Sequence, residues 1–232
     1  MDRFNFEFRR RWLLGVAGTT VLMATVPAVA QTGKKTDAET IAVPATERLM
    51  RENALTSRVM LIYAAAARRL GEGEDLESGV FTQAAEVMRD FVHAYHEKIE
   101  EEEVFPDFKK AGRMVDLVGV LQSQHAAGKQ LTDKVLAAAP GIANSDKRKA
   151  LIEAVEATVT LYRPHIARED TDLLPTLRSL MTPNEFEALG QTLEKKENEM
   201  LGTDGFEKAV KKVEAIEKKL GTYDLSQFTP KT

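Results

Sequence analysis

Apolar residues recur at three- and four-residue spacing along most of the chain, and strand signals are weak. This periodicity predicts an all-α protein. Pro and Gly punctuate the pattern, because Pro lacks an amide hydrogen and Gly lacks a side chain. We therefore predict four long helices and two shorter ones, at about residues 44–70, 76–110, 114–139, 146–180, 183–200 and 206–220.

Four long helices with short connections favour an antiparallel up-down four-helix bundle, here over residues 44–180. We expect Pro106 to bend or break the second helix, and Pro164 and Pro175 to interrupt the fourth. The two shorter helices form a predicted C-terminal extension at 181–221, packed on the outside or end of the bundle. Residues 222–232 are expected to be a tail.

The first 30 residues have the order of features found in a secretory signal peptide. Three arginines, Arg9 to Arg11, precede an apolar run from Trp12 to about Val26. The small residues Ala28-Val29-Ala30 follow as a cleavage pattern. The arginines followed by Trp12 and two leucines resemble a twin-arginine signal.

Cleavage after Ala30 would make Gln31 the first residue of the mature chain, with 31–43 as a flexible lead-in. We therefore expect a periplasmic or secreted protein. The alternative is a membrane anchor that stays attached, but Gly15, Gly18 and several threonines make the run weakly apolar for a spanning helix.

Composition removes several classes of function. The formal net charge is -4, from 32 basic and 36 acidic residues, and no basic face stands out. Neither nucleic acid nor, after signal cleavage, a membrane is therefore an expected partner. The chain has no cysteine, which excludes disulfides, thiolate catalysis and cysteine-ligated zinc or iron–sulfur sites.

Polar residues interrupt the predicted core-facing stripe of each long helix. The helical spacing places Asn53, His96, His125, His165 and Glu169 on the core side, with Glu100 one turn after His96 at the edge of its stripe. An unpaired polar group costs roughly 2–7 kcal/mol on leaving water. A metal ion offsets that cost for several groups at once, and imidazole and carboxylate are suitable ligands for iron and related metals.

The pattern occurs twice in matching contexts. His96 is followed by Glu100 and Pro106, and His165 is followed by Glu169 and Pro175, at the same two spacings. The preceding helices also correspond, since Glu52-Asn53 precedes the first pair much as Gln124-His125 precedes the second. The chain therefore reads as two helical hairpins related by a pseudo-twofold axis. Glu101 and Glu102, in the acidic run after Glu100, are expected on a solvated face.

At these residues the chain resembles the hemerythrin-like, His-His-Glu cation-binding family, over about Pro44 to Leu180. The resemblance implies a four-helix bundle with a non-haem di-iron centre bridged by two carboxylates. It implies iron as the cofactor, with manganese or zinc as alternatives. The implied terminal ligands are His96, His125 and His165, and the implied bridging or chelating ligands are Glu100 and Glu169.

Two positions depart from the family pattern. Asn53 stands where the first helix of the family usually supplies a histidine, and Lys129 stands where oxygen-carrying members use another. His93 is a possible substitute ligand and Glu52 a possible oxygen ligand, whereas the charge of Lys129 would oppose a second cation. These departures predict a depleted or asymmetric iron site rather than reversible oxygen transport.

The leading hypothesis is an exported iron-binding protein that binds or senses oxygen, peroxide or nitric oxide. One alternative is a di-iron or mononuclear iron oxidase or peroxidase, although the Glu-x-x-His motifs of ferritin-like oxidases are missing. The other is a metal-free structural or interaction protein, which the Asn53 and Lys129 departures would suit. Whether the protein is an enzyme stays open, and no catalytic residue is assigned.

Overall fold

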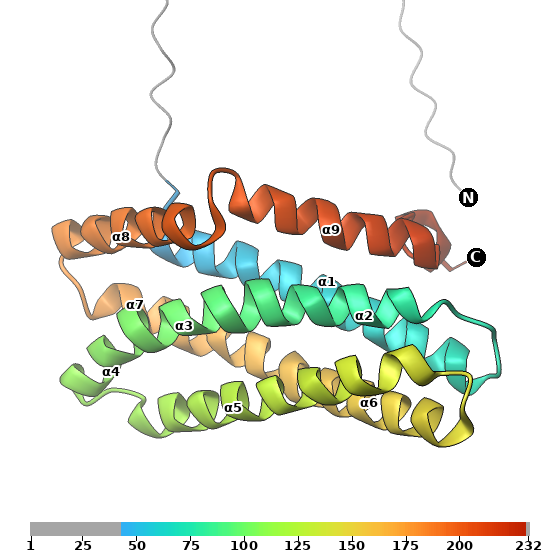
Figure 1. The fold of residues 1–232 in the computed structure, drawn as a ribbon. Coiled ribbons are helices and arrows are strands. Elements are labelled where there is room, and N and C mark those ends of the chain that lie inside the picture. The colour runs from blue at the N-terminus through green and yellow to red at the C-terminus, as the bar shows by residue number, and fades with distance from the viewer. Residues whose placement is uncertain (1–42, 231–232) are drawn as a thin grey trace, which may run out of the picture. The chain divides into compact units, whose positions relative to one another are not determined.

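A computed structural model describes residues 43–230, and every regular element in that range is helical (Figure 1). The predicted signal peptide and nearly all of the lead-in lie outside the described residues. None of the helices within residues 43–230 is both long and apolar enough to cross a bilayer.

Four long helical segments come first along the chain. The first is α1 (Ala45–Gly71), and the third is α5 (Val115–Ala138), extended by a 3-10 turn at Ala139–Gly141. The second and fourth are built from several pieces each. The second joins α2 (Ser78–Val87), a π-helical stretch (Met88–His96), α3 (Glu97–Ile99), a second π-helical stretch (Glu100–Val104) and α4 (Phe105–Ala111). The fourth joins α6 (Ser145–Arg168), a π-helical stretch (Glu169–Leu173) and α7 (Leu174–Ser179).

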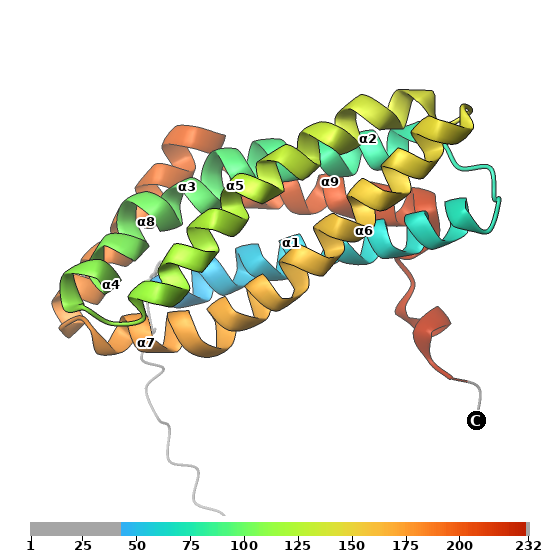
Figure 2. The same ribbon diagram turned by 90° about the horizontal axis from the view of Figure 1, so that it is seen from below.

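The four segments lie side by side and share one apolar core (Figures 1 and 2). Helix α1 packs against α6 and α2, and α5 packs against α6 and α2. The residues that the periodicity assigns to the core are buried, which removes apolar surface from water at roughly 25 cal/mol per Å². The largest fully buried side chains include Tyr63, Tyr95, Tyr162, Phe81, Phe105 and Phe108.

The prolines do not break the long segments. The predicted interruption at Pro164 is wrong, because this residue lies inside α6. Pro164 and Thr160, whose carbonyl loses its helical partner, are both exposed, so water can hydrogen-bond the freed carbonyl. Pro106 and Pro175 each follow a π-helical stretch and lie in the first turn of α4 and α7, where a missing amide hydrogen costs little.

Two further helices, α8 (Pro183–Leu201) and α9 (Gly205–Leu220), cover the outside of α1 and α2. A capping box at Thr182 and Glu185 begins α8. Partly buried ion pairs to α1 reinforce the apolar contacts: Arg48 binds Glu197, and Arg58 Nε lies 2.9 Å from Glu217 Oε1. The predicted tail contains a short 3-10 helix at Leu225–Phe228.

A glycine lets one tyrosine cross the core. The Tyr162 hydroxyl donates a hydrogen bond of 2.6 Å to Glu97 Oε1 on the second segment. A Cβ atom at Gly128, on α5, would lie 2.0 Å from the Tyr162 hydroxyl oxygen and 2.9 Å from its Cζ. Gly128 is therefore required for this close approach of α5 and α6.

We expect Gly128→Ala to lower the free energy of unfolding by about 1–3 kcal/mol, because the new methyl group displaces Tyr162 from Glu97. Gly119→Ala is the matched control in the same helix, since a Cβ atom added at Gly119 would have no neighbour within 4 Å. It should stabilise the protein by about 0.5–1 kcal/mol, the usual gain of alanine over glycine inside a helix. Urea unfolding followed by circular dichroism measures both, and equal effects would refute the packing argument.

Candidate metal centre

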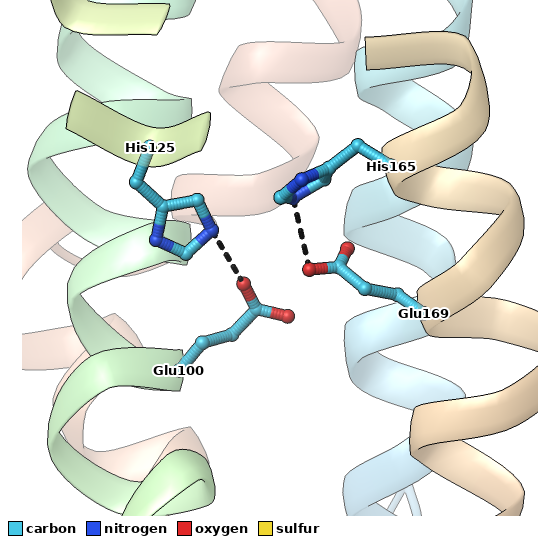
Figure 3. A group of neighbouring side chains, drawn as sticks. All are labelled: Glu100, His125, His165 and Glu169. Atoms are coloured by element: carbon cyan, nitrogen blue, oxygen red, sulfur yellow. Dashed lines mark ion pairs between the residues drawn. The ribbon is translucent and has the colours of Figure 1, made fainter. Parts of the chain in front are cut away.

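Four buried side chains converge between three of the long segments (Figure 3). Glu100 comes from the second segment, His125 from α5, and His165 and Glu169 from the fourth. Each offers one ligand atom, and these four atoms lie within 4.8 Å of one another. At most 4% of the surface of any of these residues is exposed. We call this group the four-residue cluster.

Local helix geometry aims these side chains. His165 and Glu169 are one turn apart on the same face, which places His165 Nε2 2.9 Å from Glu169 Oε1. Both glutamates begin a π-helical stretch, at Glu100–Val104 and at Glu169–Leu173. Such wider turns are frequent at functional sites. In both halves of the sequence repeat, the cluster glutamate is therefore oriented by the first turn of a π-helical stretch.

Outer hydrogen bonds fix the two histidines of the cluster. His125 Nδ1 lies 2.9 Å from Glu101 Oε1, and His165 Nδ1 lies 2.9 Å from Gln124 Oε1. Because carboxylate and amide oxygens only accept hydrogen bonds, both Nδ1 atoms donate. Each Nε2 atom then carries a lone pair directed toward the cluster, which is the tautomer that a metal ligand needs.

The inner atoms of the cluster lack hydrogen-bond partners among the described residues. Both oxygens of Glu100, both oxygens of Glu169 and Nε2 of His125 are buried and unpartnered. His125 Nε2 lies 3.5 Å from Glu100 Oε2, and the His165–Glu169 pair, although close, is not aligned as a hydrogen bond. Each unsatisfied buried group costs about 1–3 kcal/mol.

A cation fits this arrangement. Two neighbouring ligands around one ion with bonds of ~2.1 Å are about 3 Å apart, close to the separation of His165 and Glu169. The donor set of two imidazoles and two carboxylates is one that iron, manganese and zinc accept. Glu100, His125, His165 and Glu169 would hold the ion, and its charge would offset the unpartnered carboxylates.

The charges within the cluster are strongly coupled. Burial and the charge of Glu169 raise the pKa of Glu100 well above its ordinary value. Burial acts in the same sense on Glu169, but its interactions with His165, His96 and His125 together outweigh burial and lower the pKa. Burial lowers the pKa of His125. Two carboxylates this close resist being charged together, so a bound cation would replace the proton held by Glu100.

The sequence profile of the hemerythrin HHE cation binding domain matches residues 45–177. The chain belongs to this family. It is also 39% identical over 231 residues to uncharacterized proteins of Mycobacterium bovis and of Mycobacterium tuberculosis, and the alignment covers 95% of this chain and 91% of each relative. No solved structure matches the chain significantly.

His96 lies beside the cluster of this hemerythrin domain rather than within it. Its Nδ1 is 2.8 Å from Glu52 Oε2, and its Nε2 is 3.0 Å from Asn53 Oδ1 and 3.8 Å from Glu100 Oε1. Burial alone would lower the pKa of His96, but the charges of Glu100 and Glu52 and the hydrogen bond that His96 donates to Glu52 raise it to about 10. The structure does not bring this predicted ligand into the group formed by the other four.

The remaining accessory candidates lie outside the cluster. His93 hydrogen-bonds Glu97 Oε2 at 3.0 Å and Thr132 Oγ1 at 2.8 Å, so both ring nitrogens are engaged. Lys129 is 44% exposed, with its Nζ 3.9 Å from oxygens of Glu97 and Glu101. Neither side chain occupies a ligand position of the hemerythrin domain in this structure.

Sequence reasoning missed the outer partners. The sequence pattern places Glu101 on a solvated face, but its carboxylate accepts a hydrogen bond from His125. Asp170, which follows Glu169 in the same way, accepts a hydrogen bond of 2.9 Å from Asn53 Nδ2. The sequence repeat could have indicated these hydrogen-bond partners, because an acidic residue follows the cluster glutamate in both halves.

In the metal-free protein we expect Glu100→Gln to raise the free energy of unfolding by about 1 kcal/mol near neutral pH, because it removes a buried carboxylate without a partner. Since the pKa of Glu100 is raised in the folded state, its protonation favours folding, and this contribution is fully present below the ordinary pKa of 4.5. The contribution is lost as pH rises through the folded-state pKa.

The stability of the unaltered protein should therefore fall more steeply with rising pH than that of Glu100→Gln. Urea unfolding with a chelator present, at about pH 5 and about pH 9, measures the difference. Glu156→Gln, at an exposed position of α6, is the control and should leave the pH dependence unchanged. An identical pH dependence for all three proteins would contradict the assignment of buried charge to Glu100.

Proposed function

We propose that this hemerythrin-domain protein is a non-haem iron-binding protein that binds or senses oxygen, peroxide or nitric oxide. The observation that carries the proposal is the set of unpartnered ligand atoms of Glu100, His125 and Glu169, which face one another in the protein interior. A metal-free structural protein would gain nothing from this costly arrangement, because apolar residues of similar volume would pack there without an electrostatic penalty.

The proposal includes an antiparallel up-down four-helix bundle as the scaffold. Its support is the pairwise packing of α1 with α6 and α2, and of α5 with the same two helices. Metal sites of bundles are built from side chains that project inward from facing helices. The four-residue cluster has this character, since its members come from three of the four long segments.

The residues around the cluster suit the binding of a small ligand. Two imidazoles and two carboxylates would leave a coordination position on bound iron open for a small ligand. Bound iron would also supply a change of oxidation state. Phe105 stacks on His125 with ring centres 5.6 Å apart, and Tyr162 meets His165 edge-on at the same separation. These rings hold both imidazoles in place and keep bulk water away from them.

Anaerobic reconstitution with ferrous iron tests the proposal. We expect iron to bind and to raise the melting temperature, because a ligand at 100 times its Kd adds about 2.7 kcal/mol to the stability of the folded state. Exposure of the ferrous protein to nitric oxide should produce a new optical band.

His165→Ala should abolish both effects, whereas Lys129→Ala, at the exposed rim, should retain them. Retention of fewer than about half an iron per chain would remove the support for the proposal. Iron binding without any response to nitric oxide, oxygen or peroxide would remove only its sensing part.

We further propose that the chain is exported by the twin-arginine route. The support is the N-terminal order of three arginines, an apolar run and Ala28-Val29-Ala30. Mass spectrometry of protein recovered from the native cell should find Gln31 as the first residue. Replacing Arg9, Arg10 and Arg11 with lysine preserves charge and should block export, whereas Arg3→Lys should not. Export of the triple variant at a normal rate would contradict this route.

A further inference from the structure

One core histidine stays outside the four-residue cluster although it almost touches it. His96 is 97% shielded from solvent, and its Nε2 lies 3.8 Å from Glu100 Oε1. That nitrogen nevertheless points at the side-chain oxygen of Asn53, at 3.0 Å, while Nδ1 points at Glu52 Oε2, at 2.8 Å. Both ring nitrogens are therefore engaged by oxygen atoms that belong to α1.

The orientation of Asn53 decides what His96 can do. The Asn53 amide nitrogen donates to Asp170 Oδ1 at 2.9 Å, so its oxygen is the atom that faces His96. An amide oxygen and a carboxylate oxygen are both acceptors. His96 Nε2 must then donate its proton to Asn53, which leaves that nitrogen without a lone pair for a metal.

The two halves of the sequence repeat show where the site loses its symmetry. His165 Nδ1 is held by Gln124, and His96 Nδ1 is held by Glu52 at the corresponding place in the other half. Glu101 likewise holds His125, and Asp170 holds Asn53. The two hydrogen-bond networks match member by member.

The matched networks differ at the residue next to the centre. An amide at position 53 takes the place that the imidazole of His125 has in the other half, and it binds the Nε2 proton of His96. The acceptor that faces Nδ1 differs too, since a charged carboxylate, Glu52, faces His96 where a neutral amide, Gln124, faces His165.

We propose that this protein binds a single metal ion, held by Glu100, His125, His165 and Glu169, and that the hydrogen bonds of His96 to Glu52 and Asn53 keep it from acting as a ligand of a second ion. This inference rests on the proposed function in assuming that metal binds at the four-residue cluster. It adds the number of ions and the role of each histidine.

The hydrogen bonds of His96 support one ion rather than two. Its Nε2 lies 3.0 Å from Asn53 Oδ1 and farther, 3.8 Å, from Glu100 Oε1. A second divalent ion on the side of His96 would have to break the bonds of His96 to Glu52 and Asn53 before this imidazole could bind it.

The number of ions can be measured directly on the full mature chain. Titration with Co²⁺ and separately with anaerobic Fe²⁺, followed by elemental analysis, should give one tightly bound ion per chain. The oxidised iron form should show the electron paramagnetic resonance of an isolated high-spin ferric ion. Two ions per chain, or a magnetically coupled iron pair, would overturn the inference and leave the proposed function standing. No bound metal would overturn both.

A matched pair of variants tests the role of His96. With Co²⁺ as the probe, His96→Gln should keep one ion per chain and a similar visible spectrum. Its affinity should not fall below that of the unaltered protein, because no ligand is removed. His165→Gln should alter the spectrum and weaken binding by at least about tenfold, because it removes a ligand.

Circular dichroism and melting confirm that both variants fold before binding is compared. Weaker Co²⁺ binding and a changed spectrum in a folded His96→Gln would show that His96 is a ligand and would overturn the inference. If either variant fails to fold, the ion count and the magnetic signature of the unaltered protein decide the question alone.

Discussion

The rest of this structure depends on two carboxylates that face each other in the apolar interior. Glu100 and Glu169 are fully buried and none of their oxygens has a hydrogen-bond partner among the described residues. Burial resists the charging of both groups. The neighbouring histidines more than offset this cost for Glu169, whose pKa is lowered, but not for Glu100, whose pKa is raised. The repeated π-helical turns, the oriented imidazoles and the glycine opposite Tyr162 all serve to hold this unfavourable group in one place.

The hydrogen bonds around the cluster determine which of the buried histidines can bind a metal. An imidazole has two ring nitrogens, and the acceptor beside one decides what the other offers to a metal. Gln124 and Glu101 leave His165 and His125 with inward lone pairs, whereas Glu52 and Asn53 together leave His96 with none. Three buried histidines thus acquire different chemistry from their neighbours.

The same contrast explains which features of the structure can be predicted from the sequence alone. The helix limits follow from periodicity and from Pro and Gly, which are local features, and the family profile at 45–177 agrees with the predicted extent of 44–180. The helical spacing likewise places His125, His165 and Glu169 on inward faces and Glu100 at the edge of its stripe, and the structure groups these four residues. The continuation of α6 through Pro164 depends on which side of the helix meets solvent, and that is a tertiary property.

The role of His96 also depends on tertiary contacts, so residue spacing in the sequence does not predict it. Its motif is identical in form to that of His165, and the difference arises from an amide on another helix that is itself turned by Asp170. Sequence reasoning singles out Asn53 as a departure, but only the hydrogen-bond geometry shows the direction in which this residue changes its neighbour.

The C-terminal helices hold α1 in place independently of the four-residue cluster. Helix α1 contributes no atom to the four-residue cluster, and α8 and α9 instead clamp it from outside through Arg48–Glu197 and Arg58–Glu217. An ion at the centre would tie together the other three long segments and leave α1 to this separate external brace. Loss of such an ion would remove a link between those three segments and leave the ion pairs that hold α1 intact.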